Sequence, residues 1–397
     1  MIDPRGRDAE LALLAGGLDA AAAGSGRLLV VEGGAGIGKS VLAGAVLRLA
    51  GARGMTVLRA RGNPLDQDFS FGVARQAFAA VQAGPAWPAL CRGPAALALR
   101  ALTGGTPPPA STADATYAAE HGLAALTAAL AARAPVLLCV DDVHWADVPS
   151  LRWLTGLARR VDELPLTLLL VVRSGEPARD PYVLGECLTG ATSTLVRLGP
   201  LDATVAAELV ADRFPAAGPR FATACHEATG GNPFLLRALL THLATTGTPP
   251  GEELAPDVVG PDVVGLDEVG RWLTQRLRRL PDGCAALARA LAVLGPDARL
   301  HDAATLAGLD PGPAALAADT LRAAGIVAGL VSGSAAGAAP ATPAVPGRLS
   351  LTHPIVAAAL HDGLGIEKDA EIVQDLEQGL YRKRMLSYGG LLKQKHK

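Results

Sequence analysis

The segment Gly33–Ser40, which reads GGAGIGKS, constrains this chain more than any other stretch. It matches the pattern G-x-x-x-x-G-K-[S/T], directly follows the apolar run RLLVVE and directly precedes the helical run VLAGAVLRLA. Glycines let such a loop curl so that backbone N–H groups point inward, and the following helix N-terminus adds partial positive charge. The segment therefore predicts a phosphate-binding loop rather than a flexible glycine-rich turn with an incidental lysine, and its spacing excludes G-x-G-x-x-G dinucleotide binding.

Each position of this loop has a predicted role in holding ATP and Mg²⁺. Lys39 is the single lysine upstream of Glu367, and its compact ammonium would reach the β and γ phosphates, where a planar guanidinium would not substitute. Ser40 would ligate Mg²⁺. The remaining nucleotide contacts are expected from Gly33, Gly34, Ala35, Gly36, Ile37, Gly38 and Val41.

A second candidate element is PVLLCVDDVHWAD, an apolar strand followed by paired carboxylates. Asp141 is placed to hold Mg²⁺, directly or through water, and Asp142 to orient and polarise the attacking water. Asp147 ahead of Ser150 is better explained as a helix N-cap. The segment HEATG at His226 lacks the second histidine of H-E-x-x-H, and no G-x-S-x-G occurs, so zinc protease and serine hydrolase chemistry find no support.

Short apolar runs alternate with helical stretches in the first half and predict an α/β fold with a parallel sheet. The expected strands are residues 28–31, 56–58, 136–140, 166–172 and 194–198. Past Leu201 the strand signal stops, and three helices are expected at 203–214, 220–228 and 234–245.

The C-terminal half predicts a further unit. Residues 248–266 contain four prolines and are expected to be a linker. Helices near 271–280 and 285–294, then short strands within 325–331 and 349–351, suggest a winged-helix-like α+β domain. The tail looks foreign to the rest, since five of the six lysines lie beyond Ile366. The predicted divisions are a P-loop NTPase core at 1–200, a helical lid at 201–247, the linker, the winged-helix-like domain at 267–364 and an atypical charged tail at 365–397.

The amino-acid composition limits which partners and which kinds of site this chain can have. The 397 residues carry 36 Lys+Arg against 38 Asp+Glu, which gives no global field to gather nucleic acid or an anionic membrane. The N-terminus is charged where a secretory signal would be apolar, and no apolar stretch approaches the length of a membrane span. Five scattered cysteines without a C-x-x-C pair indicate neither disulfides nor zinc. We expect a cytoplasmic protein with no membrane association.

Several motifs together resemble those of a known family. These are GRDAEL at Gly6, GGAGIGKS at Gly33, DFSFGVARQ at Asp68, DDVHWADVPSL at Asp141, VVRSGE at Val171, TGGNPFLLRALL at Thr229 and LTHPIVAAAL at Leu351. In these motifs the chain resembles the AAA-type ATPase modules of the STAND class, in particular those of large ATP-binding LuxR-family regulators. The resemblance implies an ATPase core, a helical lid and a winged helix that closes over nucleotide.

Three further nucleotide contacts follow from the resemblance alone. Arg173 corresponds to a residue that senses the phosphates, Pro233 to a lid residue that touches the nucleotide, and His353 to a winged-helix histidine that contacts ADP. Each has an ordinary structural alternative: a solvated arginine opening a loop, a helix-starting proline, and a structural histidine. The helix-turn-helix that ends full-length regulators is absent, which argues against sequence-specific DNA binding by this chain.

The sequence therefore predicts a signalling ATPase that binds Mg-ATP and hydrolyses it slowly, with a protein partner or self-association as its output. The alternative is a transcription-regulator fragment that acts as a non-enzymatic DNA or protein interaction module. A truncated or frameshifted product with no separate role is the third possibility.

Overall fold

The chain divides into two compact units, Met1–Gly199 and Pro200–Lys397. The structure is a computed structural model, and it describes residues 4–103, 112–176, 178–190, 193–246, 267–295, 298–328 and 348–362. The predicted linker at 248–266 and the predicted tail at 365–397 lie outside the described residues.

A five-stranded sheet with strand order β2-β3-β4-β1-β5 forms the centre of the first unit. All its strand pairs are parallel, which confirms the predicted α/β fold class and each of the five expected strands. The strands are β1 (Arg27–Gly33), β2 (Thr56–Arg61), β3 (Val136–Asp141), β4 (Leu166–Arg173) and β5 (Ser193–Leu198).

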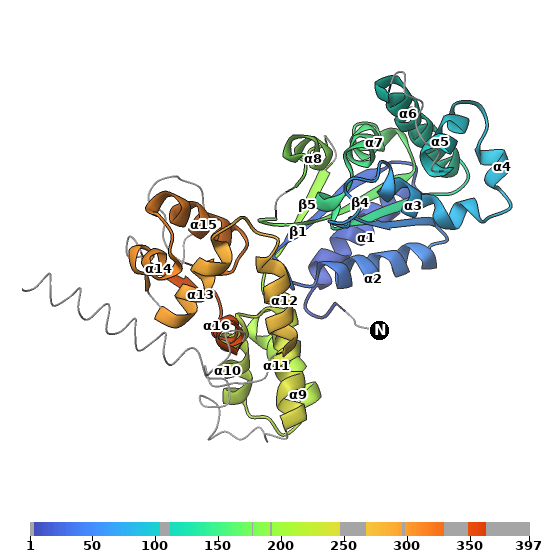
Figure 1. Cartoon of the computed structure of the whole chain (residues 1–397). Helices are drawn as coiled ribbons and strands as arrows, with labels where there is room; N and C mark the ends of the chain where they lie inside the picture. The colour runs from blue at the N-terminus through green and yellow to red at the C-terminus, as the bar shows by residue number, and fades with distance from the viewer. Residues whose placement is uncertain are drawn as a thin grey trace, which may run out of the picture. The chain divides into compact units, whose positions relative to one another are not determined.

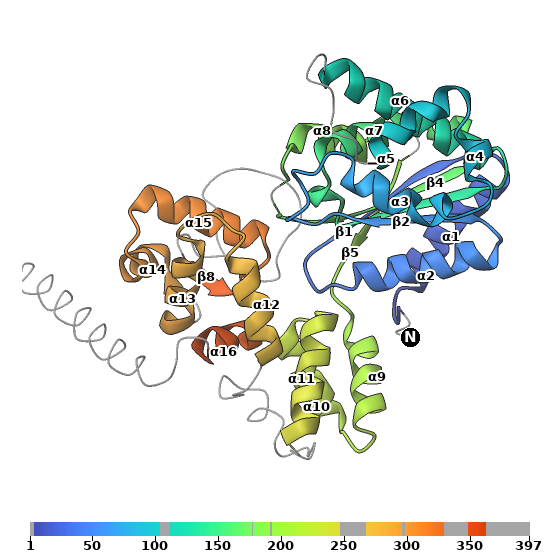
Figure 2. The ribbon, with the colours of Figure 1, turned by 45° about the vertical axis from the view of Figure 1, so that its right-hand side comes forward.

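Helices cover both faces of this sheet because successive strand residues point to opposite sides. In β1, Leu28 and Val30 join one hydrophobic cluster, while Leu29 and Val31 join the other. Figures 1 and 2 show α1 (Asp8–Ala22) and α2 (Lys39–Ala52) on one face and α6, α7 and α8 on the other. The remaining elements of this unit are α3 (Gly72–Gln82), α4 (Trp87–Leu90), η1 (Gly93–Leu97), α5 (Ala98–Thr103), α6 (Thr112–Ala131), η2 (Val143–Trp145), α7 (Val148–Ala158), η3 (Val161–Glu163) and α8 (Pro181–Leu188).

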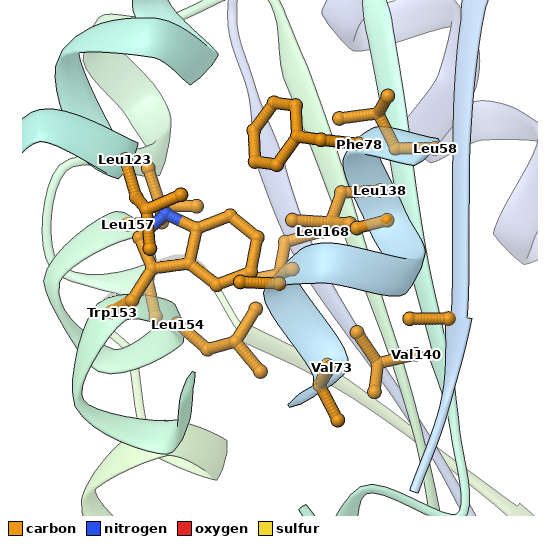
Figure 3. Packing of buried hydrophobic residues seen from close by; sticks show 14 of the residues in the cluster. Leu58, Val73, Phe78, Leu123, Leu138, Val140, Trp153, Leu154, Leu157 and Leu168 are labelled. Atoms are coloured by element: carbon orange, nitrogen blue, oxygen red, sulfur yellow. The ribbon is translucent and has the colours of Figure 1, made fainter. Parts of the chain in front are cut away.

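Two large aromatic side chains fill the core between the sheet and the helices of the second face. Trp153 of α7 and Phe78 of α3 are almost fully buried, and their ring centroids lie 5.7 Å apart. Figure 3 shows both rings packed among leucines of the strands and of α6 and α7. This packing holds α3 and α7 to the sheet, and thereby fixes the loops that precede them at its carboxyl edge.

The second unit combines helices with a small antiparallel sheet of strand order β6-β8-β7. The helices predicted from the sequence are α9 (Ala203–Arg213), α10 (Pro219–Thr229), α11 (Pro233–Thr246), α12 (Asp267–Leu277) and α13 (Cys284–Leu294). The other elements are β6 (Ala298–Arg299), α14 (Leu300–Ala307), α15 (Pro311–Ala323), β7 (Val327–Ala328), β8 (Arg348–Leu351) and α16 (Pro354–Asp362).

One hydrophobic cluster runs through the described part of the second unit, from Ala206 of α9 to Leu360 of α16. The helices expected to form a lid and the elements expected to form a winged helix therefore contribute to the same core. Their division into a lid and a winged-helix-like domain stays a prediction.

Candidate active site

The loop between β1 and α2 has the backbone shape that its glycines permit. Gly36 and Gly38 have φ values of 77° and 99°, in the left-handed region that favours glycine. A Cβ on Gly33 would lie 2.9 Å from Cγ2 of Ile37 and 3.0 Å from the carbonyl oxygen of Leu198. Glycine is therefore required at 33 by close packing and favoured at 36 and 38 by backbone conformation.

Lys39 begins α2 and folds back over the loop. Its side chain is almost buried, with 6% of the residue exposed. Its Nζ donates to the carbonyl oxygens of Gly33, at 2.9 Å, and of Gly34, at 2.7 Å. The loop thus holds an ammonium group at the helix N-terminus, where both the charge and the helix dipole attract an anion.

Ser40 and Asp141, which are 101 positions apart in the sequence, meet at the carboxyl edge of the sheet. Oγ of Ser40 donates to Oδ2 of Asp141 at 2.8 Å. The other carboxylate oxygen, Oδ1, accepts from the backbone N–H of Asp142 at 3.0 Å. A hydroxyl and a carboxylate side by side are oxygen ligands of the kind that Mg²⁺ takes.

This pair fits Mg²⁺ held partly by phosphates better than an ion enclosed by protein. Among the described residues, no group of three or more His, Cys, Asp or Glu side chains could hold a metal ion. Mg²⁺ commonly binds through one or two protein ligands plus phosphate oxygens and waters. The residues present therefore fit a Mg-nucleotide.

Asp142 is buried beside two arginines. Its residue is 3% exposed, and it adopts a left-handed backbone conformation with φ of 49°. Oδ2 accepts from Arg61 through Nη2 at 2.8 Å and Nε at 3.1 Å, and Oδ1 lies 3.5 Å from Nη2 of Arg173. The hydrogen bond that Arg61 donates to Asp142 is the main cause that raises the pKa of the Arg61 guanidinium. Both oxygens of the predicted water-orienting carboxylate thus face guanidinium groups.

Arg173 ends β4 directly opposite the start of the phosphate loop, because it pairs in register with Gly33. The backbone N–H of Ser174 also donates to the carbonyl of Gly33 at 3.1 Å. The Arg173 guanidinium carbon lies 4.9 Å from the ring centroid of Trp145. The structure therefore places Arg173 beside Asp142 at the carboxyl edge of the sheet. Its contact with the phosphates stays a prediction.

Asp147 has the structural role expected of it. It is the N-cap of α7, where Oδ1 accepts from the N–H of Ser150 at 2.9 Å. The same carboxylate accepts from the N–H groups of Phe71, at 2.7 Å, and Val73, at 3.2 Å. It therefore joins the loop before α3 to the loop after β3.

Pro233 and His353 belong to the second unit. Pro233 is the first residue of α11, and Oδ1 of Asn232 accepts from the N–H of Phe234 at 3.0 Å. The His353 ring packs so closely on Gly230 that a Cβ there would lie 2.3 Å from its Cε1. Burial lowers the pKa of His353. Both residues have structural contacts within their own unit, and their contact with nucleotide stays a prediction.

Sequence reasoning missed Arg61 and Trp145. Arg61 ends β2 and pairs in register with Asp141, and the backbone N–H of Gly62 donates to the Asp141 carbonyl at 2.8 Å. Its place at the end of a parallel strand was a usable signal, because such ends gather at one edge of the sheet. Nothing in the local sequence marks Trp145 as a partner of Arg173.

Comparison with known proteins identifies the first unit. The sequence model of the AAA ATPase domain family matches residues 4–172. A comparison with curated proteins gave no significant match. No helix within the described residues is both long and apolar enough to cross a bilayer.

A solved structure with a TM-score above 0.5 shares the fold. A Walker-type ATPase of Pyrococcus abyssi matches with a TM-score of 0.51 and 14% identity, over 89% of this chain and 95% of that one. A STAND protein with a tetratricopeptide repeat sensor from Pyrococcus horikoshii matches with a TM-score of 0.36 and 14% identity, over 96% of this chain and 46% of that one. The RuvB Holliday junction branch migration motor of Thermotoga maritima matches with a TM-score of 0.39 and 14% identity, over 81% of this chain and 89% of that one. The last two TM-scores are below 0.5.

The family match and the loop geometry agree on the nature of the first unit. It contains an AAA-type ATPase domain of P-loop NTPase fold, and such a domain binds nucleotide. The residues at the carboxyl edge of its sheet form the candidate site.

Proposed function

We propose that this chain is a signalling switch of the AAA/STAND type that binds Mg-ATP and hydrolyses it slowly. The observation that carries the proposal is the 2.8 Å contact between Ser40 of the phosphate loop and Asp141 of β3, beside the ammonium of Lys39. A loop that binds phosphate needs only its glycines and lysine. The added hydroxyl–carboxylate pair is what a nucleotide-bound Mg²⁺ requires.

The loop residues supply the binding energy for the phosphates. Backbone N–H groups of residues 33–41 would face the phosphate oxygens, from the end of β1 to Val41 in the first turn of α2. Lys39 would exchange its two carbonyl acceptors for the β and γ phosphates, because a charged acceptor forms the stronger hydrogen bond. Ser40 and Asp141 would hold Mg²⁺, which supplies positive charge to the phosphate oxygens.

Asp142 would orient and polarise the attacking water. A carboxylate in this role must accept a hydrogen bond from that water. Here both oxygens face arginines, Arg61 at 2.8 Å and Arg173 at 3.5 Å. An acceptor already engaged by cations is a poorer acceptor for a water proton, which supports slow hydrolysis controlled by the arrangement of these arginines.

Output would come from the second unit. The resemblance to LuxR-family regulators implies that a lid and a winged helix respond to the bound nucleotide. Pro233 of the lid and His353 of the winged helix would then contact that nucleotide. A protein partner or a second copy of the chain would then read the state of the switch. A change of this kind requires that ATP and ADP bind the two states with different affinity.

Replacing Lys39 tests the binding site. Lys39→Ala should lower ATP affinity well over tenfold, because a charge-assisted phosphate contact contributes about 1.5 to 3 kcal/mol. Calorimetry of ATP binding measures this loss, and Arg48→Ala is the matched control, since it removes an exposed positive charge from the same helix. Unchanged ATP affinity in Lys39→Ala refutes the proposed site.

Positive side chains on the second unit could favour the DNA-binding alternative. Four arginines lie on or just after α12: Arg271, Arg276, Arg278 and Arg279. Of these, Arg276 is 4% exposed and donates to the carbonyl of Ala324, which follows α15. It therefore holds two helices together rather than facing a partner. Gel shifts of the whole chain with specific and scrambled duplexes should show no sequence selectivity at physiological salt.

A further inference from the structure

Trp145 lies between the paired carboxylates and α7 and contacts Arg173. It closes the short turn η2, which follows Asp142, and it is 7% exposed. The guanidinium carbon of Arg173 lies 4.9 Å from its ring centroid, within the range in which a cation is attracted to an aromatic face. The preceding residue, His144, contributes its Nδ1 as an acceptor for the backbone N–H of Arg173 at 3.4 Å. Both residues of this turn therefore hold Arg173.

The polar contacts of the Arg173 side chain are long by comparison. Nη1 lies 3.4 Å from Oε1 of Glu176, and Nη2 lies 3.5 Å from Oδ1 of Asp142. Arg61 binds the same Asp142 at 2.8 Å. Among the contacts of the described residues, the buried Nε of Arg173 has no hydrogen-bond partner. The hydrogen bonds from Arg173 to Glu176 and Asp142 are therefore long, and its Nε–H is available to another acceptor.

Stacking and hydrogen bonding use different parts of a guanidinium group. The face of the plane contacts the ring, while all five N–H donors lie in the plane and point outward. An arginine held by its face can therefore change its hydrogen-bond partners without leaving its place. A lysine, which lacks a planar face, could not be held in this way.

We propose that Trp145 is a positioning residue, which holds the guanidinium of Arg173 by its face so that the N–H edge can pass from Asp142 and Glu176 to the terminal phosphate of ATP. This inference rests on the proposed function, because it needs ATP at the phosphate loop. When Arg173 moves its hydrogen bonds to the phosphate, Oδ1 of Asp142 is released to accept from water. Trp145 thereby links recognition of the third phosphate to the availability of Asp142.

Steady-state hydrolysis of ATP by the whole chain separates this role from a structural one. Trp145→Leu keeps an apolar side chain without the aromatic face, and should lower kcat by about three- to thirtyfold. ADP affinity should stay within about twofold, because ADP lacks the phosphate that Arg173 reaches. Trp145→Phe keeps an aromatic face and should recover most of the lost kcat.

The second unit offers a matched control. Trp272 also lies against an arginine, with the guanidinium carbon of Arg276 5.5 Å from its ring. Trp272→Leu removes the same type of side chain and the same type of contact outside the candidate site, and should leave kcat unchanged. An equal loss of kcat in both leucine variants would assign the effect to general destabilisation and overturn the inference.

Fluorescence of the unchanged chain provides a readout that needs no stable Trp145 variant. A non-hydrolysable ATP analogue should change tryptophan emission where ADP does not, because only the analogue moves the guanidinium edge beside the ring. Arg173→Ala should abolish the change. Emission that responds equally to ADP and to the analogue, or a response that survives in Arg173→Ala, contradicts the proposal.

The outcomes also distinguish this inference from the proposed function. If the unchanged chain neither binds nor hydrolyses ATP, the proposed function fails. If it hydrolyses ATP, Arg173→Ala is impaired and Trp145→Leu keeps full kcat, the proposed function stands and the positioning role of Trp145 is wrong.

Discussion

The carboxyl edge of the parallel sheet and the turn Thr229–Pro233 of the second unit both carry residues expected to contact nucleotide, yet they are built differently. At the sheet edge, charged side chains from separate strands face one another, as Asp142 faces Arg61. At the turn, the His353 ring lies on Gly230, and a Cβ there would lie 2.3 Å from it. This imidazole thus packs on a glycine, where any side chain would clash with it.

This difference shows which region can perform chemistry by itself. The sheet edge contains an ammonium, a hydroxyl–carboxylate pair and the buried carboxylate of Asp142, proposed to orient water, within one unit. His353, which packs on this turn, has a pKa that burial lowers, and burial therefore favours its neutral form. We expect changes at Asp141 and Asp142 to act on nucleotide binding and catalysis, and changes at Gly230 to act on folding.

The largest effect is expected from Asp142→Asn. The variant should retain Mg-ATP and lose about a hundredfold or more in turnover, because a positioned general base typically contributes that much. Asp141→Asn, the adjacent control, should weaken the Mg²⁺ dependence of ATP binding itself. Phosphate release and calorimetry measure the two effects, and equal, unchanged release in both variants would refute this division of roles.

Next in size is the loss of stability in Asp147→Ala. This buried carboxylate accepts from the N–H groups of Phe71, Val73 and Ser150, so its removal leaves buried donors unpaired. We expect a loss of about 3 kcal/mol in urea unfolding. Asp202→Ala removes an exposed N-cap from α9 in the second unit and should cost about 1 kcal/mol. Similar losses in both would show that the sheet edge is not specially dependent on this carboxylate.

Gly230→Ala should cost about 2 kcal/mol, because it adds a clash with His353 to the strain of a φ of +54°. Gly308 ends α14 with a φ of +66° and has nothing within 4 Å of an added Cβ, so Gly308→Ala should cost only about 1 kcal/mol. Thermal unfolding compares the two. When His353 is also replaced by alanine, Gly230→Ala and Gly308→Ala should cost the same free energy of unfolding. A difference that remains would show that the added Cβ at residue 230 does not clash with His353.

The sequence predicted the strands and the phosphate loop well because both are local patterns. Each strand of the parallel sheet is a continuous apolar run, and the loop is a continuous motif. The two-residue strand β6 (Ala298–Arg299) was missed because so short a segment has no periodicity. Helices α14 and α15 were also missed. The contacts of Arg61 and Trp145 depend on which strands are neighbours in the sheet, and this is a tertiary property.

The smallest effect expected is the pH dependence contributed by His353. Its folded pKa lies below the ordinary value of 6.5, so the unfolded chain takes up the proton more readily. Its contribution to stability is fully present above about pH 6.5 and is lost as the pH falls toward the lowered pKa. Unfolding of His353→Gln should therefore depend less on pH than that of the unchanged chain below pH 6.5. Identical pH profiles would show that the ring is not desolvated.

The Mg²⁺ dependence of ATP binding tests the central claim most directly. Calorimetric titration of ATP into the unchanged chain, with Mg²⁺ and with a chelator, should show affinity at least about tenfold higher with Mg²⁺, as expected when hydroxyl and carboxylate oxygens bind the metal. In Ser40→Ala, which removes the hydroxyl 2.8 Å from Asp141, this difference should largely disappear. Two results would contradict a Mg-ATP site at this sheet edge. One is an ATP affinity of the unchanged chain that is the same with and without Mg²⁺, and the other is a full Mg²⁺ dependence in Ser40→Ala.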